Sequence, residues 1–469
     1  MEIHSSAGAS VYGTSIVGVE SAWSDLRALA GAENMRAATE ADRVDGGLPR
    51  MVIEPGNADE VAAALKIATG AGLKVIPRGG GSKMGWGNLL RNGESRNSEI
   101  RSSEWGSGEL ILSTRRLSRV LEHAWGDMTA TVEAGCTFQQ FQQTLAEHGQ
   151  RLALDPLWPA QSTIGGILAT NDSGALRVRF GSLRDLIIGI TLALPDGTLA
   201  KSGGKVVKNV AGYDLPKLAT GSLGTLGIIT QAIFRLHPMP RETRSLSFAI
   251  SGFASGTESF DSRSSDNQRM NALLLAIQDC DMVPTGVQVR AGSSLTPEFD
   301  IRFEGTATGC EAQIEQTLRI TAGARRIDSP ADVWNASSSL MLMLPSGTEP
   351  SVVGKFSLLP ADLGQFLNLI RKISEDRQLK WRLVAQAVGV GYVRLVAADV
   401  EPLLDAIKEL RKSLESRGGS FVVLRCPLEI KSKIDVWGSA SDALPLMRSI
   451  KAQFDPTGVL NPGRFIGGI

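Results

Sequence analysis

The stretch Pro77-Arg78-Gly79-Gly80-Gly81-Ser82-Lys83-Met84-Gly85-Trp86-Gly87-Asn88 decides how this sequence is interpreted. Successive glycines let the backbone bring N–H groups to an anion without obstruction by side chains. The order Gly-Ser-Lys excludes a Walker loop, and Met84 stands where the G-x-G-x-x-G fingerprint needs its last glycine. A glycine triplet alone fits an ordinary turn equally well, so its surroundings must decide.

The residues before this loop predict a β-α-β unit that ends in it. Met51-Val52-Ile53 is typical of a short strand, and Lys74-Val75-Ile76 of a second one. Between them, Asn57 followed three residues later by Glu60 matches a helix-capping box. The loop is therefore expected at the end of the second strand.

Clusters of small residues recur further along the chain. They are Ser162–Gly166, Leu168–Gly174, Gly212–Leu215 and Gly221–Gly227, the last directly before a strand that starts at Ile228. Tight turns would explain one or two such clusters. Several of them on successive loops of one domain predict a long groove, as an extended dinucleotide requires.

These blocks resemble the FAD-linked oxidases of the vanillyl-alcohol oxidase type over residues 45–240 and again at Asn461–Phe465. The run Gly203–Leu215 is most similar to the FAD-binding E-type subunits of bacterial glycolate oxidases. The resemblance implies an α+β protein, with a two-lobed FAD-binding domain and a second α+β domain built on an antiparallel sheet with helices.

The resemblance also implies the residues that contact the cofactor. The pyrophosphate is expected on the glycine-rich loop, and the adenine and ribose beside the later clusters. The expected cofactor-binding set is Arg78, Gly79, Gly80, Gly81, Ser82, Lys83, Trp86, Pro156, Thr163, Gly165, Gly166, Ala169, Ser173, Gly174, Gly181, Arg184, Asp185, Gly212 and Ile228.

Two departures from related enzymes matter for the chemistry. Some relatives attach FAD through a histidine in the pyrophosphate loop, where this chain has Ser82, so non-covalent FAD is expected. Relatives that oxidise D-lactate or glycolate carry histidines in the second domain as base and metal ligands. The four histidines here all precede residue 241, so no second-domain histidine can serve as base or metal ligand, and no metal site is expected.

The chain is expected to divide into four segments. Residues 1–44 form an N-terminal segment that is partly disordered, and residues 45–240 the FAD-binding domain. Residues 241–430 form the second, substrate-side domain, and residues 431–469 return to the FAD domain. In the second domain Arg382, Arg394 and Arg425 could clamp a small carboxylate, although strand arginines are more often solvated or paired.

The bulk composition excludes several classes of function. The 49 basic and 49 acidic residues balance, so no overall field attracts nucleic acid or an anionic membrane. The four cysteines lack the spacing of zinc or iron–sulfur sites, which favours a reduced cytosolic protein. No apolar run is long enough for a direct membrane span, and residues 1–18 do not read as a secretory signal.

The leading functional expectation is the FAD-binding subunit of a glycolate (2-hydroxy acid) oxidase complex. Its partners would be a catalytic flavoprotein subunit and an iron–sulfur subunit, in the cytoplasm or peripheral at the inner membrane through those partners. A self-sufficient FAD oxidase of another small alcohol or hydroxy acid is a second possibility, with Lys208 or Tyr213 as candidate catalytic base. A non-catalytic flavin-fold scaffold is the third.

Overall fold

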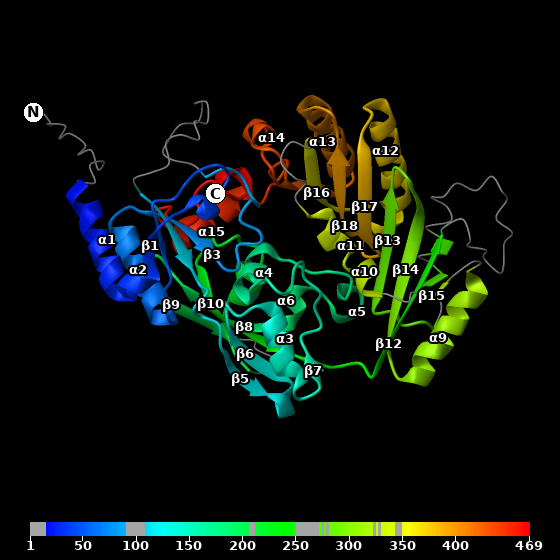
Figure 1. Ribbon diagram of the computed structural model, residues 1–469, viewed down its shortest axis with the longest axis horizontal. Helices are drawn as coiled ribbons and strands as arrows, with labels where there is room; N and C mark the ends of the chain where they lie inside the picture. The colour runs from blue at the N-terminus through cyan, green and yellow to red at the C-terminus, as the bar shows by residue number, and fades with distance from the viewer. Residues whose placement is uncertain are drawn as a thin grey trace, which may run out of the picture.

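The computed structural model describes residues 16–90, 108–205, 212–249, 272–273, 276–277, 281–321, 325–326, 330–342 and 349–469. The protein combines two small sheets in one half of the molecule with one large antiparallel sheet in the other (Figure 1). This arrangement confirms the expected α+β class, with a two-lobed domain followed by an antiparallel sheet covered by helices.

The first lobe is a four-stranded sheet in the order β1-β2-β4-β3. Its strands β2 and β3 both run parallel to β4, which lies between them, so the predicted β-α-β unit is split by a later strand. Asn57 accepts a hydrogen bond from the backbone N–H of Glu60 and starts the connecting helix, as predicted. The elements are α1 (Ile16–Ala30), β1 (Met35–Ala37), β2 (Met51–Ile53), α2 (Ala58–Gly70), β3 (Lys74–Arg78) and β4 (Glu109–Ser113).

The sequence did not reveal that residues 16–37 belong to this lobe. Helix α1 packs on α2 through Trp23 and Leu26, and β1 pairs antiparallel with β2. The segment that was set apart as N-terminal and partly disordered therefore contributes a helix and an edge strand, while residues 1–15 lie outside the described part of the chain.

The second lobe is a five-stranded antiparallel sheet in the order β5-β6-β10-β8-β9. Its buried face packs against α3 and α4 through residues such as Phe141 and Ile167. The elements are β5 (Val120–Ala124), β6 (Thr129–Glu133), α3 (Phe138–Ala146), β7 (Gln150–Arg151), α4 (Ile164–Thr170), α5 (Arg177–Phe180), α6 (Leu183–Leu186), β8 (Ile187–Ala193), β9 (Leu199–Gly203), α7 (Leu215–Ala219), β10 (Ile228–Arg235) and β11 (His237–Pro238).

The second domain is an eight-stranded antiparallel sheet in the order β15-β12-β14-β13-β17-β18-β16-β19. Helices α12 and α13 bury one face of it, with Ile370 and Ile407 in the core. The elements are β12 (Glu242–Ala249), β13 (Gly286–Gly292), β14 (Leu295–Gly305), α9 (Ala307–Ile320), β15 (Arg325–Arg326), α10 (Pro330–Trp334), α11 (Ala336–Leu340), β16 (Ser351–Ser357), α12 (Leu363–Asp376), β17 (Lys380–Gln386), β18 (Val390–Val396), α13 (Val400–Glu415), β19 (Ser420–Arg425), α14 (Leu428–Lys433) and α15 (Leu444–Phe454).

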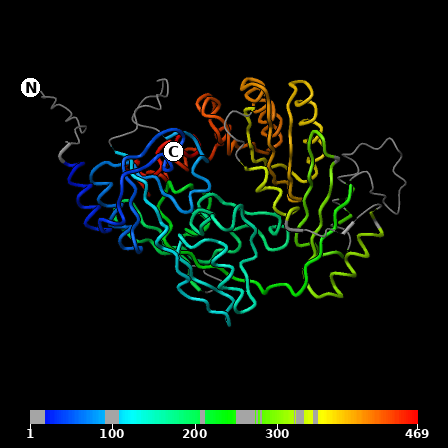
Figure 2. Tube along the Cα trace, in the orientation of Figure 1, coloured from blue at the N-terminus to red at the C-terminus, as the bar shows by residue number. Residues whose placement is uncertain are grey.

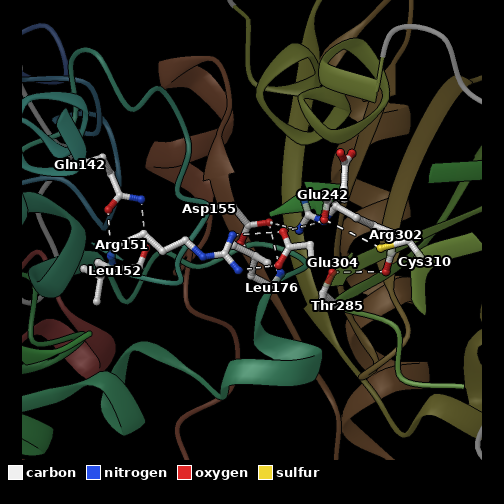
Figure 3. A network of polar contacts seen from close by, with 10 residues as sticks. All are labelled: Gln142, Arg151, Leu152, Asp155, Leu176, Glu242, Thr285, Arg302, Glu304 and Cys310. Carbon is white, nitrogen blue, oxygen red and sulfur yellow. Dashed lines mark hydrogen bonds and ion pairs between the residues drawn. The ribbon is translucent and has the colours of Figure 1, made fainter. Parts of the chain in front are cut away.

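Charged side chains join the two domains where the chain passes between them. Arg151 of β7 forms a bidentate pair with Glu304 of β14, at 2.5 and 3.1 Å. Arg302 lies 3.6 Å from Asp155 (Figure 3). Its guanidinium lies over the Trp334 ring. Because these side chains are largely shielded from solvent, they fix the orientation of the second domain more firmly than surface pairs would.

The C-terminal segment returns to the first lobe, as Figure 2 shows by the red trace beside the blue one. Leu460 forms a parallel bridge with Val75 of β3, and Val459 and Leu460 are buried in the core of that lobe. Residues of α1 and of the C-terminal segment thus share the core of the same lobe.

Candidate functional site

The glycine-rich loop that follows β3 presents several consecutive backbone N–H groups as hydrogen-bond donors. Among the described residues, no backbone N–H group from Gly79 to Lys83 has a hydrogen-bond acceptor. Consecutive unsatisfied amides at the end of a strand form a concavity suited to a phosphate, and each charge-assisted bond they make is worth roughly 1.5–3 kcal/mol.

Close packing, more than unusual dihedral angles, explains the glycines of this loop. A Cβ on Gly80 would lie 1.7 Å from the carbonyl oxygen of Gln161, and one on Gly79 would lie 2.1 Å from Thr163 Oγ1. Only Gly81 of the triplet has a positive φ, at +79°. The loop is therefore fitted against the segment that precedes α4, and any side chain would force the two apart.

A cavity of about 760 Å³, including its open mouth, lies along this loop. Its walls come from the loop after β3, the start of α4, the turn before β10 and the C-terminal segment. The lining residues are Pro77, Arg78, Gly79, Gly80, Gly81, Ser82, Lys83, Met84, Trp86, Thr114, Ser162, Thr163, Gly165, Gly166, Ala169, Thr170, Leu223, Gly224, Gly227, Ile228, Ile229, Asn461 and Arg464.

The C-terminal segment holds the far side of the loop in place. Arg464, which is buried, donates hydrogen bonds to the carbonyl oxygens of Met84 and Trp86, the latter at 2.6 Å. Asn461 donates to the carbonyl of Leu223 at 2.7 Å. These bonds tie two walls of the cavity to residues far along the chain.

Lys83 has a different partner from the one expected. Its amine lies 2.8 Å from the carboxylate of Asp172, and both side chains are buried, at 6% and 1% exposure. The same carboxylate accepts a hydrogen bond from the backbone N–H of Leu157. The charge of Lys83 is therefore balanced by a carboxylate inside the protein.

The guanidinium of Arg78 is also paired with a carboxylate of the protein. Its guanidinium lies 2.6 Å from Asp42, which Arg36 contacts at 2.6 Å as well. These hydrogen bonds, with those from Thr39, hold the pKa of the Asp42 carboxyl far below its usual range. Asp42 thus fixes the side chain of the residue that opens the loop.

We expect Asp42→Asn to lower the free energy of unfolding in a pH-dependent way. A carboxyl whose pKa is depressed in the folded state stabilises above its unfolded value, and loses this contribution as pH falls toward the folded value. The difference between wild type and variant should be largest near neutral pH and narrow below about pH 4. Urea unfolding at pH 7 and pH 3 measures it, and a difference independent of pH would contradict the assignment.

One face of the second domain's sheet closes the space beside the loop. Trp86 and Leu157 of the first domain share an apolar cluster with Tyr392 and Val384 of the second. Lys355 lies on the same sheet face, directly opposite Tyr392 in the pairing of β16 with β18. Burial lowers the pKa of the Lys355 amine, and the nearby Arg177 and Lys83 lower it further against the opposing effect of Asp172.

The structure brings much of the expected cofactor set to the cavity and leaves the rest elsewhere. The residues that line it are Arg78, Gly79, Gly80, Gly81, Ser82, Lys83, Trp86, Thr163, Gly165, Gly166, Ala169 and Ile228. The residues that do not are Pro156, Ser173, Gly174, Gly181, Arg184, Asp185 and Gly212.

Several of the residues outside the cavity have evident local contacts. A Cβ on Gly174 would lie 2.4 Å from the carbonyl oxygen of Asp155, and Asp185 forms a capping box with Ser182. Of the candidate bases, Tyr213 is 91% exposed, and Lys208 lies outside the described residues. Tyr213 therefore does not lie in an enclosed site.

The sequence did not predict that Asp42, Asp172, Lys355, Asn461 and Arg464 belong to this region. For Asn461 and Arg464 a signal was present, since the Asn-Pro-Gly-Arg-Phe motif was recognised without a role for its side chains. Asp172 lay inside a recognised small-residue cluster. Asp42 and Lys355 carried no local signal.

The cavity fits FAD, because it combines unsatisfied amides for a pyrophosphate with an elongated wall of small and apolar residues. Residues 49–203 match the family described as FAD binding domain, and residues 439–465 match the C-terminal domain of FAD linked oxidases. This chain is therefore an FAD-binding flavoprotein of the FAD-linked oxidoreductase class.

Named proteins resemble the chain over most of its length. It is 24% identical to glycolate oxidase subunit GlcD of Bacillus subtilis, covering 89% of each chain. It is 26% identical to D-lactate dehydrogenase of Archaeoglobus fulgidus, covering 89% of this chain and 91% of the relative. The fold is that of p-cresol methylhydroxylase, with a TM-score of 0.70 at 15% identity over 96% of each chain.

Two further findings concern the described part of the chain only. It contains no group of three or more histidine, cysteine, aspartate or glutamate side chains placed to hold a metal ion. Within it, too, no helix has the length and apolar character needed to cross a bilayer.

Proposed function

We propose that the protein is the FAD-binding subunit of a glycolate (2-hydroxy acid) oxidase or dehydrogenase complex. The observation that carries this proposal is the loop Gly79–Lys83, whose free amides face a cavity of about 760 Å³. The relatives named for glycolate and D-lactate support the hydroxy-acid class. The partners proposed are a catalytic flavoprotein subunit and an iron–sulfur subunit.

The residues of the cavity would bind and orient the cofactor. The loop amides would hold the pyrophosphate, the small residues at the start of α4 would allow close approach, and Arg464 would keep the loop in register. Bound FAD supplies a two-electron acceptor for oxidation of an alcohol carbon. Trp86 and the apolar cluster around it would exclude water from the side facing the second domain.

We also propose that the FAD is held without a covalent bond. Among the described residues that line the cavity there is no histidine, cysteine or tyrosine. Urea denaturation followed by ultrafiltration should therefore recover all of the flavin in the filtrate. Yellow colour retained by the unfolded chain would contradict this.

The roles proposed for the two flavoprotein subunits rest on the absence of histidine from the second domain. Residues 241–469 contain none, so the proton of the substrate hydroxyl has no imidazole acceptor in the second domain. The proposal is that a partner flavoprotein oxidises the acid and that this subunit relays electrons, in the cytoplasm or at the inner membrane through its partners.

A second candidate function is self-sufficient oxidation of a hydroxy acid, and Lys355 is the observation that favours it. Among the described residues its amine has no hydrogen bond or ion pair, and burial lowers its pKa from the ordinary value of a lysine. A positioned general base contributes roughly 10²–10⁴-fold to a rate.

Anaerobic mixing with glycolate and D-lactate separates the two functions. Under the relay proposal, purified protein keeps its oxidised flavin spectrum, and the flavin is reduced only when the native partners are present. Bleaching by the isolated chain, slowed by Lys355→Met but not by Lys408→Met on the exposed face of α13, would establish the second function instead. A colourless purified protein would contradict both and leave only a scaffold.

Affinity purification from the native host tests the assembly. The proposal expects a second flavoprotein and an iron–sulfur protein to be recovered with this chain, with iron present in the purified complex. Recovery of the chain alone, fully loaded with FAD, would contradict the proposed subunit role.

A further inference from the structure

Three arginines of the second domain fall into one row across neighbouring strands. Arg382 of β17 pairs directly with Arg394 of β18, and Arg394 pairs with Val353 of β16. Val353 in turn pairs with Arg425 of β19. Side chains of directly paired residues point to the same face of a sheet, so the arginines share one face.

That face is the one turned toward the FAD-binding domain. Val353, Val384 and Tyr392 lie on it, and they share an apolar cluster with Trp86 and Leu157 of the first domain. The opposite face packs against α12 and α13 (Figure 1). The row of arginines therefore lies between the domains, beside the cofactor side of the molecule.

The row runs from solvent to the pyrophosphate loop. Arg382 is exposed, whereas Arg394 and Arg425 are half-buried. Arg425 donates a hydrogen bond to the carbonyl oxygen of Ser82 at 3.2 Å, and its guanidinium lies 5.1 Å from the centre of the Trp158 ring. An anion that follows the row from its exposed end would arrive at the glycine-rich loop.

Within the part of the chain that the structure describes, no carboxylate balances the charges of the row. Among the described residues, Arg394 donates to the carbonyl oxygen of Leu340 and the hydroxyl of Ser351, both at 3.3 Å, and to no other acceptor. Within the described residues, none of Arg382, Arg394 and Arg425 has a carboxylate within 4.0 Å, whereas Arg377 of α12 is paired with Glu409 at 2.7 Å.

The buried Nε atoms and the pKa values of these arginines agree with the lack of counter-charges. The Nε atoms of Arg394 and Arg425 are buried without any hydrogen-bond acceptor. Burial lowers the pKa of both guanidiniums, and each is lowered further by the next arginine, Arg394 by Arg382 and Arg425 by Arg394. Unpaired buried donors of like charge are costly, and a bound anion would offset that cost.

We propose that Arg394 and Arg425, with Arg382 at the exposed end, form a binding site for the carboxylate of a small organic acid. Planar guanidiniums bind carboxylates through paired N–H···O bonds, which is the contact these side chains lack. This inference deepens the second candidate function, oxidation of a hydroxy acid by this chain itself, and rests on it for the identity of the acid. The site would bring a hydroxy acid to the flavin loop from the solvent side.

Calorimetric titration of the FAD-loaded protein with oxalate tests the site without any turnover. Wild type should bind oxalate, and Arg394→Gln should weaken binding roughly tenfold or more, as expected for loss of a charge-assisted pair. Arg394→Lys should recover part of the affinity, because it restores the charge but not the planar fork. Added salt should weaken wild-type binding as well.

Two further variants keep the result interpretable. Arg319→Gln, on the exposed side of α9, removes a comparable charge far from the row and should leave the oxalate affinity unchanged. Arg382→Gln alters only an exposed side chain, so it should fold normally and still weaken binding severalfold. FAD content and the unfolding midpoint confirm that each variant is intact.

The outcomes separate this inference from the proposed function. Absence of oxalate binding to wild type, or equal binding by wild type, Arg382→Gln and Arg394→Gln, overturns the carboxylate site. Arginine-dependent oxalate binding supports it, whether or not a hydroxy acid reduces the flavin alone or with partners. Failure of every hydroxy acid to reduce the flavin even in the purified complex overturns the proposed function and leaves the carboxylate site in place.

Discussion

Gly80→Ala is expected to yield a protein that retains less than about a tenth of the wild-type FAD. The added Cβ would stand 1.7 Å from the carbonyl oxygen of Gln161, a backbone atom that cannot rotate away. The loop must then separate from the segment before α4, and its free amides lose their common direction. Flavin absorbance per mole of purified protein measures the effect.

Gly85→Ala provides a matched control in the same loop region. Nothing lies within 4 Å of the Cβ that this substitution adds, and Gly85 does not have a positive φ. We expect it to retain FAD as wild type does. Equal flavin content in both variants would show that the loop does not bind the cofactor in the way proposed.

Asp172→Ala is expected to have the largest effect on stability, a loss of about 3–5 kcal/mol in the free energy of unfolding. The substitution leaves the buried amine of Lys83 without its carboxylate partner and removes the acceptor of the Leu157 N–H. Urea unfolding of the FAD-free protein measures this loss apart from any effect on cofactor binding.

The matched control is Asp405→Ala, which breaks an exposed pair with Lys408 on α13. An exposed pair within one helix is worth roughly 0.5 kcal/mol or less, so this variant should unfold almost as wild type does. A combined Lys83→Met and Asp172→Ala variant should recover part of the lost stability, because no uncompensated charge stays buried. A double variant no more stable than Asp172→Ala would contradict the pairing.

Much of the first domain was predictable because its signals are local. Asn57 and Glu60 identify the start of α2, and Met51-Val52-Ile53 identifies β2. The glycine-rich loop was placed correctly at the end of β3, since a strand followed by glycines is a pattern contained within a few residues.

The partners of charged residues could not be predicted in the same way. Lys83 was expected to face phosphate, yet it pairs with Asp172, and Arg78 pairs with Asp42. These contacts join residues from separate lobes and loops, so they depend on the packing of the whole domain. Neither periodicity nor spacing along the chain carries that information.

The row of arginines is an intermediate case. Arg382 and Arg394 each lie six residues from Val388, so a hairpin centred on Val388 would have predicted their pairing. Arg425 joins the row only through β16, which comes earlier in the sequence than β17 and β18. That strand order cannot be read from any one hairpin.

The hydrogen bonds that Asn461 and Arg464 donate to the walls of the cavity have a consequence for biosynthesis. The glycine-rich loop emerges from the ribosome early, but the residues that hold its carbonyls and the turn at Leu223 are synthesised hundreds of residues later. The cage around the cofactor is therefore complete only when synthesis has passed residue 464. We therefore expect FAD to bind after translation, once the C-terminal segment has packed against the FAD-binding domain.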